Sequence, residues 1–215
     1  MNRPAPALLQ PRKSPRQARS AVTIEAIHTA TIQILLADGV GRLSTTRVAE
    51  RAGVSVGTMY QYYPHKQALL FAIVERQLDN ITSAMMAAIA RLEGSDLTRV
   101  ADELSAAWID VKVADNVVSR AIYAIAAEFD LSEVIGAATD QLRRAVAGLL
   151  AATPDARFDD VETVAFMVMA LLGGSVRIVM ESQAHEDDLA RLRRELPVAC
   201  RAYLNAANEA ARHGA

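Results

Sequence analysis

The segment of residues 44–66, STTRVAERAGVSVGTMYQYYPHK, constrains the fold more strongly than any other part of the chain. Ser44 or Thr45 can cap the free amides at the start of a short helix, because a side-chain oxygen at that position accepts a hydrogen bond from a first-turn N–H. On that helix Val48 and Ala49 fall on one apolar face. The segment therefore begins with a short amphipathic helix.

A sharp turn and a second short helix follow. Gly53 supplies the backbone freedom that the turn needs. Ser55 can cap the second helix, which is predicted to run to about Tyr62. Met59 and Tyr63 lie four residues apart and are expected to face inward. Two short helices joined in this way predict a helix-turn-helix, whose second helix enters the DNA major groove.

The predicted DNA contacts fall into two sets. The first reads bases from the outward face of the second helix, where Gln61 can bond an adenine edge and Thr58 can donate or accept. Its members are Val56, Gly57, Thr58, Gln61 and Tyr62. The second set holds phosphates and fixes the register on the duplex. Its members are Thr46, Arg47, Ser55, Tyr60 or Tyr62, and Lys66. Tyr60 and Tyr63 can equally be core residues whose hydroxyls reach water.

Residues 24–70 resemble the DNA-binding domain of the TetR-type (TetR/AcrR) transcriptional regulators. The resemblance includes a helix over about 21–38 that ends at Gly39, then the core TTRVAERAGVSVGTMYQYY, and then Pro64, Lys66 and the pair Leu69–Leu70. It implies an all-α fold in which a three-helix helix-turn-helix domain precedes a C-terminal helical domain for ligand binding and dimerisation. It also implies a homodimer, a double-stranded DNA operator and an unidentified small-molecule effector.

Charge is divided unevenly along the chain. Residues 1–66 hold nine Lys/Arg and three Asp/Glu, a net of 9 − 3 = +6, whereas residues 67–215 hold fourteen and twenty-two, a net of 14 − 22 = −8. A basic N-terminal part suits phosphate binding. Residues 1–19 are predicted to be a flexible basic arm, which either reaches DNA or is only a solvated tail. Residues 20–66 would be the DNA-binding domain and 67–215 the effector-binding and dimerisation domain.

The remainder of the chain shows helical periodicity and no alternating strand pattern, so the class is all-α. Helices are predicted at about 65–92, 97–113, 116–128, 132–152, 158–182 and 187–211. The helix at 158–182 is apolar nearly all round and should be buried on more than one side.

Two features of the last helices carry specific expectations. Gly173 and Gly174 weaken the helix at 158–182, which calls for compensation by the close approach of another helix. Pro197 should bend or interrupt the last helix. The resemblance implies that these last two helices pair with those of a partner chain, and the alternative is that they only complete a monomer core.

Bulky and polarizable side chains on the middle helices are the effector-binding candidates, because Met and aromatic groups form adaptable apolar pockets. They are Trp108, Tyr123, Phe129, Phe166, Met167 and Met169. Such a set is more often ordinary core, so both interpretations stay open.

Enzyme, metal and cofactor patterns are missing from the sequence. The four histidines are scattered without a metal-binding spacing, and there is no glycine-rich phosphate loop. We therefore expect no catalytic residues, no metal and no cofactor. The single cysteine, the absence of a signal peptide and the lack of an uninterrupted apolar run of 18 residues predict a cytoplasmic protein that does not span a membrane.

The sequence thus predicts a sequence-specific DNA-binding regulator, in the first instance a repressor released from a near-palindromic operator by a small molecule. Two alternatives stay open. The chain can be an activator or architectural DNA-binding protein without an effector, or a helical ligand-binding protein that no longer reads DNA.

Overall fold

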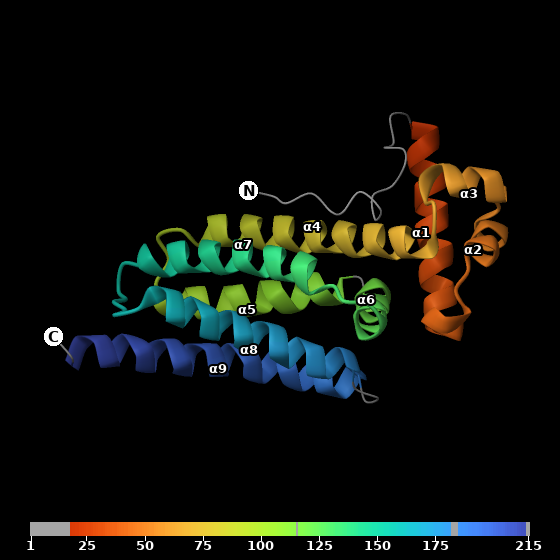
Figure 1. Cartoon of the computed structure of the whole chain (residues 1–215). Helices are drawn as coiled ribbons and strands as arrows, with labels where there is room; N and C mark the ends of the chain where they lie inside the picture. Colours follow the sequence, from red (N-terminus) through yellow and green to blue (C-terminus); the bar gives the residue numbers. More distant parts are fainter. Residues whose placement is uncertain (1–17, 115, 182–184, 214–215) are drawn as a thin grey trace. The chain divides into compact units, whose positions relative to one another are not determined.

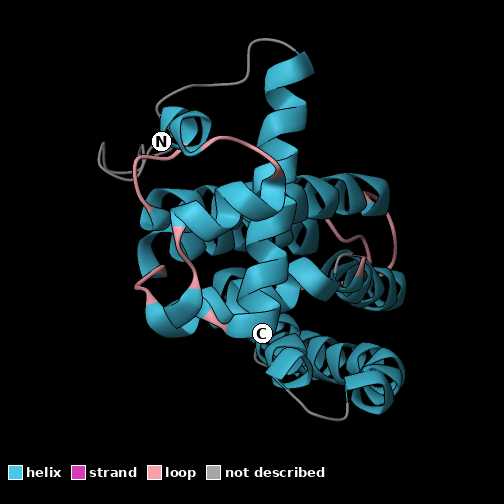
Figure 2. Cartoon of the chain, turned by 90° about the vertical axis from the view of Figure 1, so that its right-hand side faces the viewer, coloured by secondary structure: helices cyan, strands magenta, loops and turns pink. Residues whose placement is uncertain are grey.

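The computed structural model describes residues 18–114, 116–181 and 185–213, and every regular element among them is helical (Figures 1 and 2). The chain forms two compact units. Unit 1 contains residues 1–78 and 117–134, and unit 2 contains residues 79–116 and 135–215. Each unit consists of two separate stretches of sequence, and the boundaries between the units fall inside helices.

The helical elements of unit 1 begin with the predicted N-terminal domain. They are α1 (Ala18–Asp38), the 3-10 turn η1 (Val40–Arg42), α2 (Thr45–Ala52), α3 (Val56–Tyr62), the first part of α4 (Lys66–Leu92) and most of α6 (Asn116–Glu128). The elements of unit 2 are the rest of α4, α5 (Leu97–Val113), α7 (Ser132–Ala151), α8 (Val161–Glu181) and α9 (His185–His213). The all-α prediction is confirmed.

The local signals at the helix-turn-helix work as predicted. Ser44 caps α2 by accepting a hydrogen bond from the Arg47 amide at 3.3 Å. Gly53 ends α2 in the left-handed conformation, with φ +68°, and its N–H bonds to the last carbonyls of the helix. A residue with a Cβ atom could adopt this φ only with strain, so the turn depends on glycine. Figure 1 shows α1, α2 and α3 in red to orange.

Unit 1 has an apolar core below the recognition helix. Met59 of α3 is fully buried, and so are Val48 of α2, Ile27 of α1 and Leu69 of α4. Tyr63 is buried as well, so the prediction that Met59 and Tyr63 face inward is confirmed. The core therefore holds α3 by its apolar back, which leaves the opposite side of the helix exposed.

Unit 2 is built around α5, α8 and α9, which pack against one another. Asp96 caps α5 by accepting from the Arg99 amide at 2.8 Å. Leu104 and Ile109 of α5 and Leu172 of α8 are almost completely buried. On the surface, the guanidinium of Arg193 on α9 pairs with Asp110 of α5 at 2.6 Å. Unit 2 is thus formed by long helices that pack against one another along their apolar faces.

The helix α8 is buried on one side only within the chain. Val168 and Leu172 are buried, whereas Phe166 is 58% exposed and Ile178 is 72% exposed. The expectation of burial on more than one side is therefore wrong for the single chain, because no helix among the described residues covers the second face. A Cβ added at Gly173 or Gly174 would meet no atom of another described helix within 4 Å, so none of those helices approaches the glycines closely either.

Pro197 does not interrupt α9, which runs without a break from His185 to His213. A proline removes one backbone N–H and crowds the preceding turn, a cost of roughly 3 kcal/mol in a helix interior. Flanking turns whose buried residues include Leu196 and Cys200 hold the helix together across this point. The predicted interruption is therefore absent, and the alternative, a bend at Pro197, stays a prediction.

Two helices are long and apolar enough to cross a membrane by length and composition alone, namely residues 20–38 of α1 and 161–180 of α8. A core helix of a helical protein passes the same test. Both helices have a buried face that packs inside their own unit, so length and composition do not assign them to a membrane.

Candidate nucleic-acid interface

The recognition helix α3 is positioned by its own first turn. Ser55 accepts a hydrogen bond from the Thr58 amide at 3.0 Å, and the two side-chain hydroxyls lie 2.8 Å apart. Because this cap satisfies the orphan amide, the helix can begin at Val56 without a neighbour to complete it. The hydroxyl of Ser55 is therefore already engaged, although it keeps a lone pair for a phosphate-bound water.

The outward face of α3 carries most of the residues predicted to read bases. Gly57 and Gln61 are exposed, Val56 is 39% exposed and Thr58 is half-buried. This face combines one bidentate amide, one hydroxyl and two small groups, which suits a mixed polar and methyl contact with base edges. The predicted orientation is confirmed for these four residues, and their contact with DNA stays a prediction.

Tyr62 does not face outward, and this part of the prediction is wrong. The residue is 7% exposed, and its hydroxyl lies 2.7 Å from that of Ser20 on α1. Position 62 is three residues after the buried Met59, so it continues the inner stripe of the helix rather than the outer one. Tyr60, in contrast, is 42% exposed, and its hydroxyl accepts from Thr45 at 3.2 Å.

The predicted phosphate-binding set is held in different ways. Thr46 is exposed, and Lys66 is half-buried at the first residue of α4. Arg47 is already bound inside unit 1, since its guanidinium pairs with Asp38 at 2.5 Å and donates to the Arg42 carbonyl at 2.8 Å. A phosphate would have to share or replace the Asp38 carboxylate, which lowers what Arg47 can contribute.

Arg42 is a residue that the sequence reasoning missed. It is exposed at the end of η1, two residues before the N-cap of α2. A cation beside a helix N-terminus, where backbone amides also point outward, is well placed for an anion. The signal was available in the sequence, because a basic residue directly precedes the capping segment.

The net charge of the predicted DNA-binding domain, residues 20–66, is small. Residues 20–66 contain four Lys/Arg and three Asp/Glu, a net of 4 − 3 = +1, so five of the nine basic residues of the N-terminal part belong to the predicted arm, residues 1–19. Residues 1–17 of that arm lie outside the described residues. The positive charge of the N-terminal part thus lies mainly in the predicted arm, whose contact with DNA stays a prediction.

An open groove of about 450 Å³ lies between α1 and α2 in unit 1. Its lining includes Val22, Ala26, Ala30, Gln33 and Arg51. Arg51 donates to the Gln33 side chain at 2.8 Å across this groove. None of the residues predicted to touch DNA lines it.

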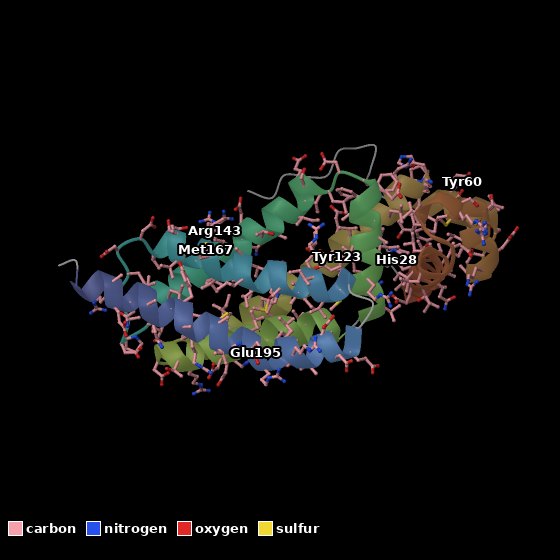
Figure 3. All side chains as sticks on the ribbon, turned by 90° about the horizontal axis from the view of Figure 1, so that it is seen from below. His28, Tyr60, Tyr123, Arg143, Met167 and Glu195 are labelled. Carbon is pink, nitrogen blue, oxygen red and sulfur yellow. The ribbon has the colours of Figure 1, made fainter. Side chains whose placement is uncertain are left out.

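The effector-binding candidates are divided between the two units. Tyr123 and Phe129 belong to unit 1 and are half-buried, whereas the other four belong to unit 2. Figure 3 labels Tyr123 and Met167. Trp108 and Met169 are buried, and Phe166 and Met167 are exposed on α8. The structure thus distributes the candidates over buried and exposed positions, and their role stays a prediction.

Trp108 is tied to the backbone of α8. Its indole N–H donates to the Leu172 carbonyl at 2.7 Å, one residue before the glycine pair. The Lys112 ammonium lies 5.1 Å from the centre of the Trp108 ring, close enough for a cation–π contact. Burial lowers the pKa of Lys112 to about 8. No group of three or more His, Cys, Asp or Glu side chains that could hold a metal occurs in the described parts of the chain.

Family models match both parts of the chain. The model described as bacterial regulatory proteins, tetR family, matches residues 21–73, and the model described as tetracyclin repressor-like, C-terminal domain, matches residues 96–204. The first covers the helix-turn-helix, and the second covers about half of the chain.

Among curated proteins, the nucleoid occlusion factor SlmA of Actinobacillus pleuropneumoniae is 31% identical over 77 residues, which is 36% of this chain and 36% of that protein. SlmA of Haemophilus ducreyi is 31% identical over 78 residues, 36% of this chain and 37% of that protein. The matched segment thus spans little more than a third of these relatives.

Solved structures share the fold over most of the chain. A regulatory protein of the tetR family from Rhodococcus RHA1 has a TM-score of 0.66 at 20% identity, covering 83% of this chain and 95% of that one. The SmeT–triclosan complex has a TM-score of 0.64 at 23% identity, covering 86% and 90%. GusR of Salmonella enterica has a TM-score of 0.66 at 19% identity, covering 88% and 98%.

Proposed function

The chain belongs to the TetR family of DNA-binding transcriptional regulators, and we propose that it is a homodimeric cytoplasmic repressor that a small molecule releases from a near-palindromic operator. The observation that carries the proposal is the exposed outer face of α3, which is fixed from behind by the Met59 core and at its start by the Ser55 cap. A helix held in this way presents Gln61 and Thr58 in one defined orientation, as base reading requires.

The dimer is supported by an uncovered apolar stripe in unit 2. Phe166, Ala170, Gly174 and Ile178 recur every four residues along α8 and are all exposed. Val198 of α9, the helix that packs beside α8, is 47% exposed. Exposed apolar side chains in a row mark an interaction surface, and a two-fold partner can cover the stripe with its own copy. Gly174 would then admit a close approach of the partner helix.

A two-fold dimer presents two recognition helices, which require two half-sites about 34–36 Å apart on one face of the duplex. We propose that Gln61, Thr58 and Val56 read the bases of each half-site. Thr46, Lys66 and Arg42 would hold phosphates, and Arg47 would contribute after exchanging part of its bond to Asp38. Tyr62, whose hydroxyl is engaged with Ser20, would act on DNA only if that bond opened.

A small-molecule effector is supported by the family and by the SmeT–triclosan complex, in which a fold of this kind holds a ligand. A ligand can release DNA only by binding more tightly to an arrangement of the dimer that does not fit the operator. Trp108 is the single tryptophan of the chain and lies in unit 2. Its fluorescence therefore offers a direct readout of binding in that unit.

The first experiment is footprinting of the purified protein on the DNA upstream of its own gene across a series of salt concentrations. We expect a protected site with two-fold symmetry and an affinity that falls steeply with salt. Gln61→Ala should remove protection at particular base pairs, whereas Gln141→Ala, an exposed glutamine in unit 2, should not. Equal binding to all sequences would contradict the proposed specific regulator.

A second candidate function is supported by the 77-residue similarity to SlmA, a nucleoid occlusion factor. In that case the chain would bind many sites and would not respond to a small molecule. Genome-wide mapping of binding sites separates the two, because a dedicated repressor should occupy few sites, close to promoters. Many dispersed sites, unaffected by any compound that changes Trp108 fluorescence, would favour the second candidate.

A further inference from the structure

A chain of polar side chains runs behind the recognition helix. The Arg76 guanidinium of α4 pairs with the Glu25 carboxylate of α1 through two contacts, at 2.5 and 3.1 Å. The same guanidinium lies 3.2 Å from Nδ1 of His28, one turn further along α1. Nε2 of His28 lies 2.7 Å from the hydroxyl of Tyr63, the residue that ends α3. Figure 3 labels His28 in this part of unit 1.

The directions of these hydrogen bonds follow from the chemistry of arginine. A guanidinium only donates, so Nδ1 of His28 must be the acceptor and carries no hydrogen. The neutral ring then has its hydrogen on Nε2, which donates to the Tyr63 hydroxyl. Burial agrees with a neutral ring, since His28 is 5% exposed and desolvation lowers its pKa to about 4. Each group in this series of hydrogen bonds therefore acts as donor or acceptor in one fixed way. Reversing the direction of one bond would break the next.

This polar chain fixes a position as well as stabilising the core. Tyr63 caps the C-terminal end of α3, and its backbone N–H bonds to the Met59 carbonyl at 2.9 Å. Apolar side chains of the same size would fill the space without the cost of burying polar groups. They would also let α3 slide or rotate, because apolar contacts have no direction. A fully satisfied polar network, in contrast, admits one arrangement.

We propose that Tyr63, His28 and Arg76 are positioning residues for DNA binding, through which α4 sets the orientation of the recognition helix without touching DNA. The inference rests on the proposed DNA-binding function. Arg76 is the key member, because it belongs to α4 and holds His28 in the tautomer that Tyr63 needs. Glu25 supports it by fixing the guanidinium through both carboxylate oxygens.

The test compares three variants. Tyr63→Phe removes only the hydroxyl, and Arg76→Met removes the donor to His28 while keeping an apolar stem. Arg99→Met in unit 2 is the matched control. It breaks a surface ion pair, to Glu103 at 2.7 Å, in which both side chains are about as exposed as in the Arg76–Glu25 pair. For each variant we would measure affinity for the operator, affinity for unrelated DNA, the salt slope and unfolding by denaturant.

We expect Tyr63→Phe and Arg76→Met each to weaken operator binding by about tenfold, as for the loss of one buried hydrogen bond. Affinity for unrelated DNA and the salt slope should stay the same, because no phosphate contact is removed. The double variant should lose little more than either single variant, since both break the same chain. Arg99→Met should change none of these quantities.

Three results would overturn the inference while the wild type binds its operator. The folded variants could bind the operator like the wild type, they could lose operator and unrelated DNA equally, or the two losses could simply add. Arg76 is partly exposed, so Arg76→Met still yields a folded protein if Tyr63→Phe does not. A wild-type protein that binds no DNA would instead overturn the proposed function, and the positioning role with it.

Discussion

Unit 1 and unit 2 expose apolar side chains in different patterns. On α1 of unit 1, Val22 is 70% exposed and Leu36 is 42% exposed, and on α3 the exposed Val56 and Tyr60 belong to the residues predicted to touch DNA. In unit 2, Phe166 and Ile178 lie on one stripe of α8. Scattered exposed residues are normal for a finished surface, whereas an aligned set is not. We therefore expect the exposed side chains of α1 to stay at the surface of unit 1, and the α8 stripe of unit 2 to be covered by the proposed partner chain.

The comparison also separates two ways of fixing geometry. In unit 1 single polar groups set the position of α3, through the Ser55 cap and the bonds of Tyr62 and Tyr63 to α1. In unit 2 the long helices α5, α8 and α9 are positioned by the faces they share. Precise orientation matters for reading bases, whereas a dimer interface can depend on area and shape.

The largest expected effect tests whether the α8 stripe is an interface. Ile178→Glu places a charge on the most exposed large apolar side chain of the proposed α8 contact, so the dimer dissociation constant should rise about 100-fold or more, the range of an interface hot spot. Val22→Glu is the matched control, because Val22 is 70% exposed and Ile178 is 72% exposed. Sedimentation equilibrium measures both. If Ile178→Glu still dimerises like the wild type, the contrast between the two units fails.

The next effect concerns stability and pH in unit 1. Burial lowers the pKa of His28 from 6.5 to about 4, so the unfolded chain binds a proton in that interval and the folded chain does not. The contribution of neutral His28 to the free energy of unfolding is therefore fully present above pH 6.5. It is lost as pH falls toward 4, which lowers the free energy of unfolding by up to about 3 kcal/mol. Denaturant unfolding at several pH values should show this loss, with a shallower pH dependence in His28→Gln. An equally steep dependence in that variant would assign the loss to other groups.

A smaller effect separates base reading from phosphate binding on the unit 1 surface. Gln61→Ala should weaken operator binding by roughly 1–3 kcal/mol and relax the preference at particular base pairs. Lys66→Ala should weaken binding to all DNA and lower the salt slope by about one. Titrations with the operator and unrelated DNA at several salt concentrations distinguish them. An unchanged slope for Lys66→Ala would remove it from the phosphate-binding set.

Unit 1 and unit 2 also differ in which of their features could be predicted from the sequence. The caps at Ser44 and Ser55 and the turn at Gly53 are local signals, because each depends on the residue and its near neighbours. Tyr62 was misassigned although its spacing from Met59 places it on the inner stripe of α3, whereas its bond to Ser20, a residue far away in sequence, follows from no local signal. Two further contacts could not be predicted, because they depend on how helices pack and not on near neighbours in the sequence. They are the ion pair of Arg47 with Asp38 and the polar side-chain network from Arg76 to Tyr63.

In unit 2 the helix bounds were predictable, whereas the neighbours of each helix were not. The periodicity of α8 indicates that the helix is apolar on several sides but not which molecule covers them. Phe166 and Met167, candidates for an effector pocket by composition, are exposed in the single chain. The distinction between pocket, core and interface requires the packing of other elements and of a partner, which no local pattern encodes.

The smallest expected effect compares two glycines with the same free space. A Cβ at Gly53 or at Gly174 would meet no atom within 4 Å, but only Gly53 has a positive φ, of +68°. Gly53→Ala should therefore destabilise the protein by about 1 kcal/mol. Gly174→Ala should stabilise the α8 helix by about 1 kcal/mol, because alanine has the higher helix propensity.

The dimer makes the second substitution informative. If a partner helix approaches Gly174 closely, the added methyl group should weaken dimerisation even though the single chain becomes more stable. Denaturant unfolding measures the stability of the variant, and sedimentation at several protein concentrations measures its dimerisation, so the two effects can be separated. A Gly174→Ala variant that is more stable at every concentration would show that α8 pairs, if at all, through Phe166 and Ile178 and not through its glycines.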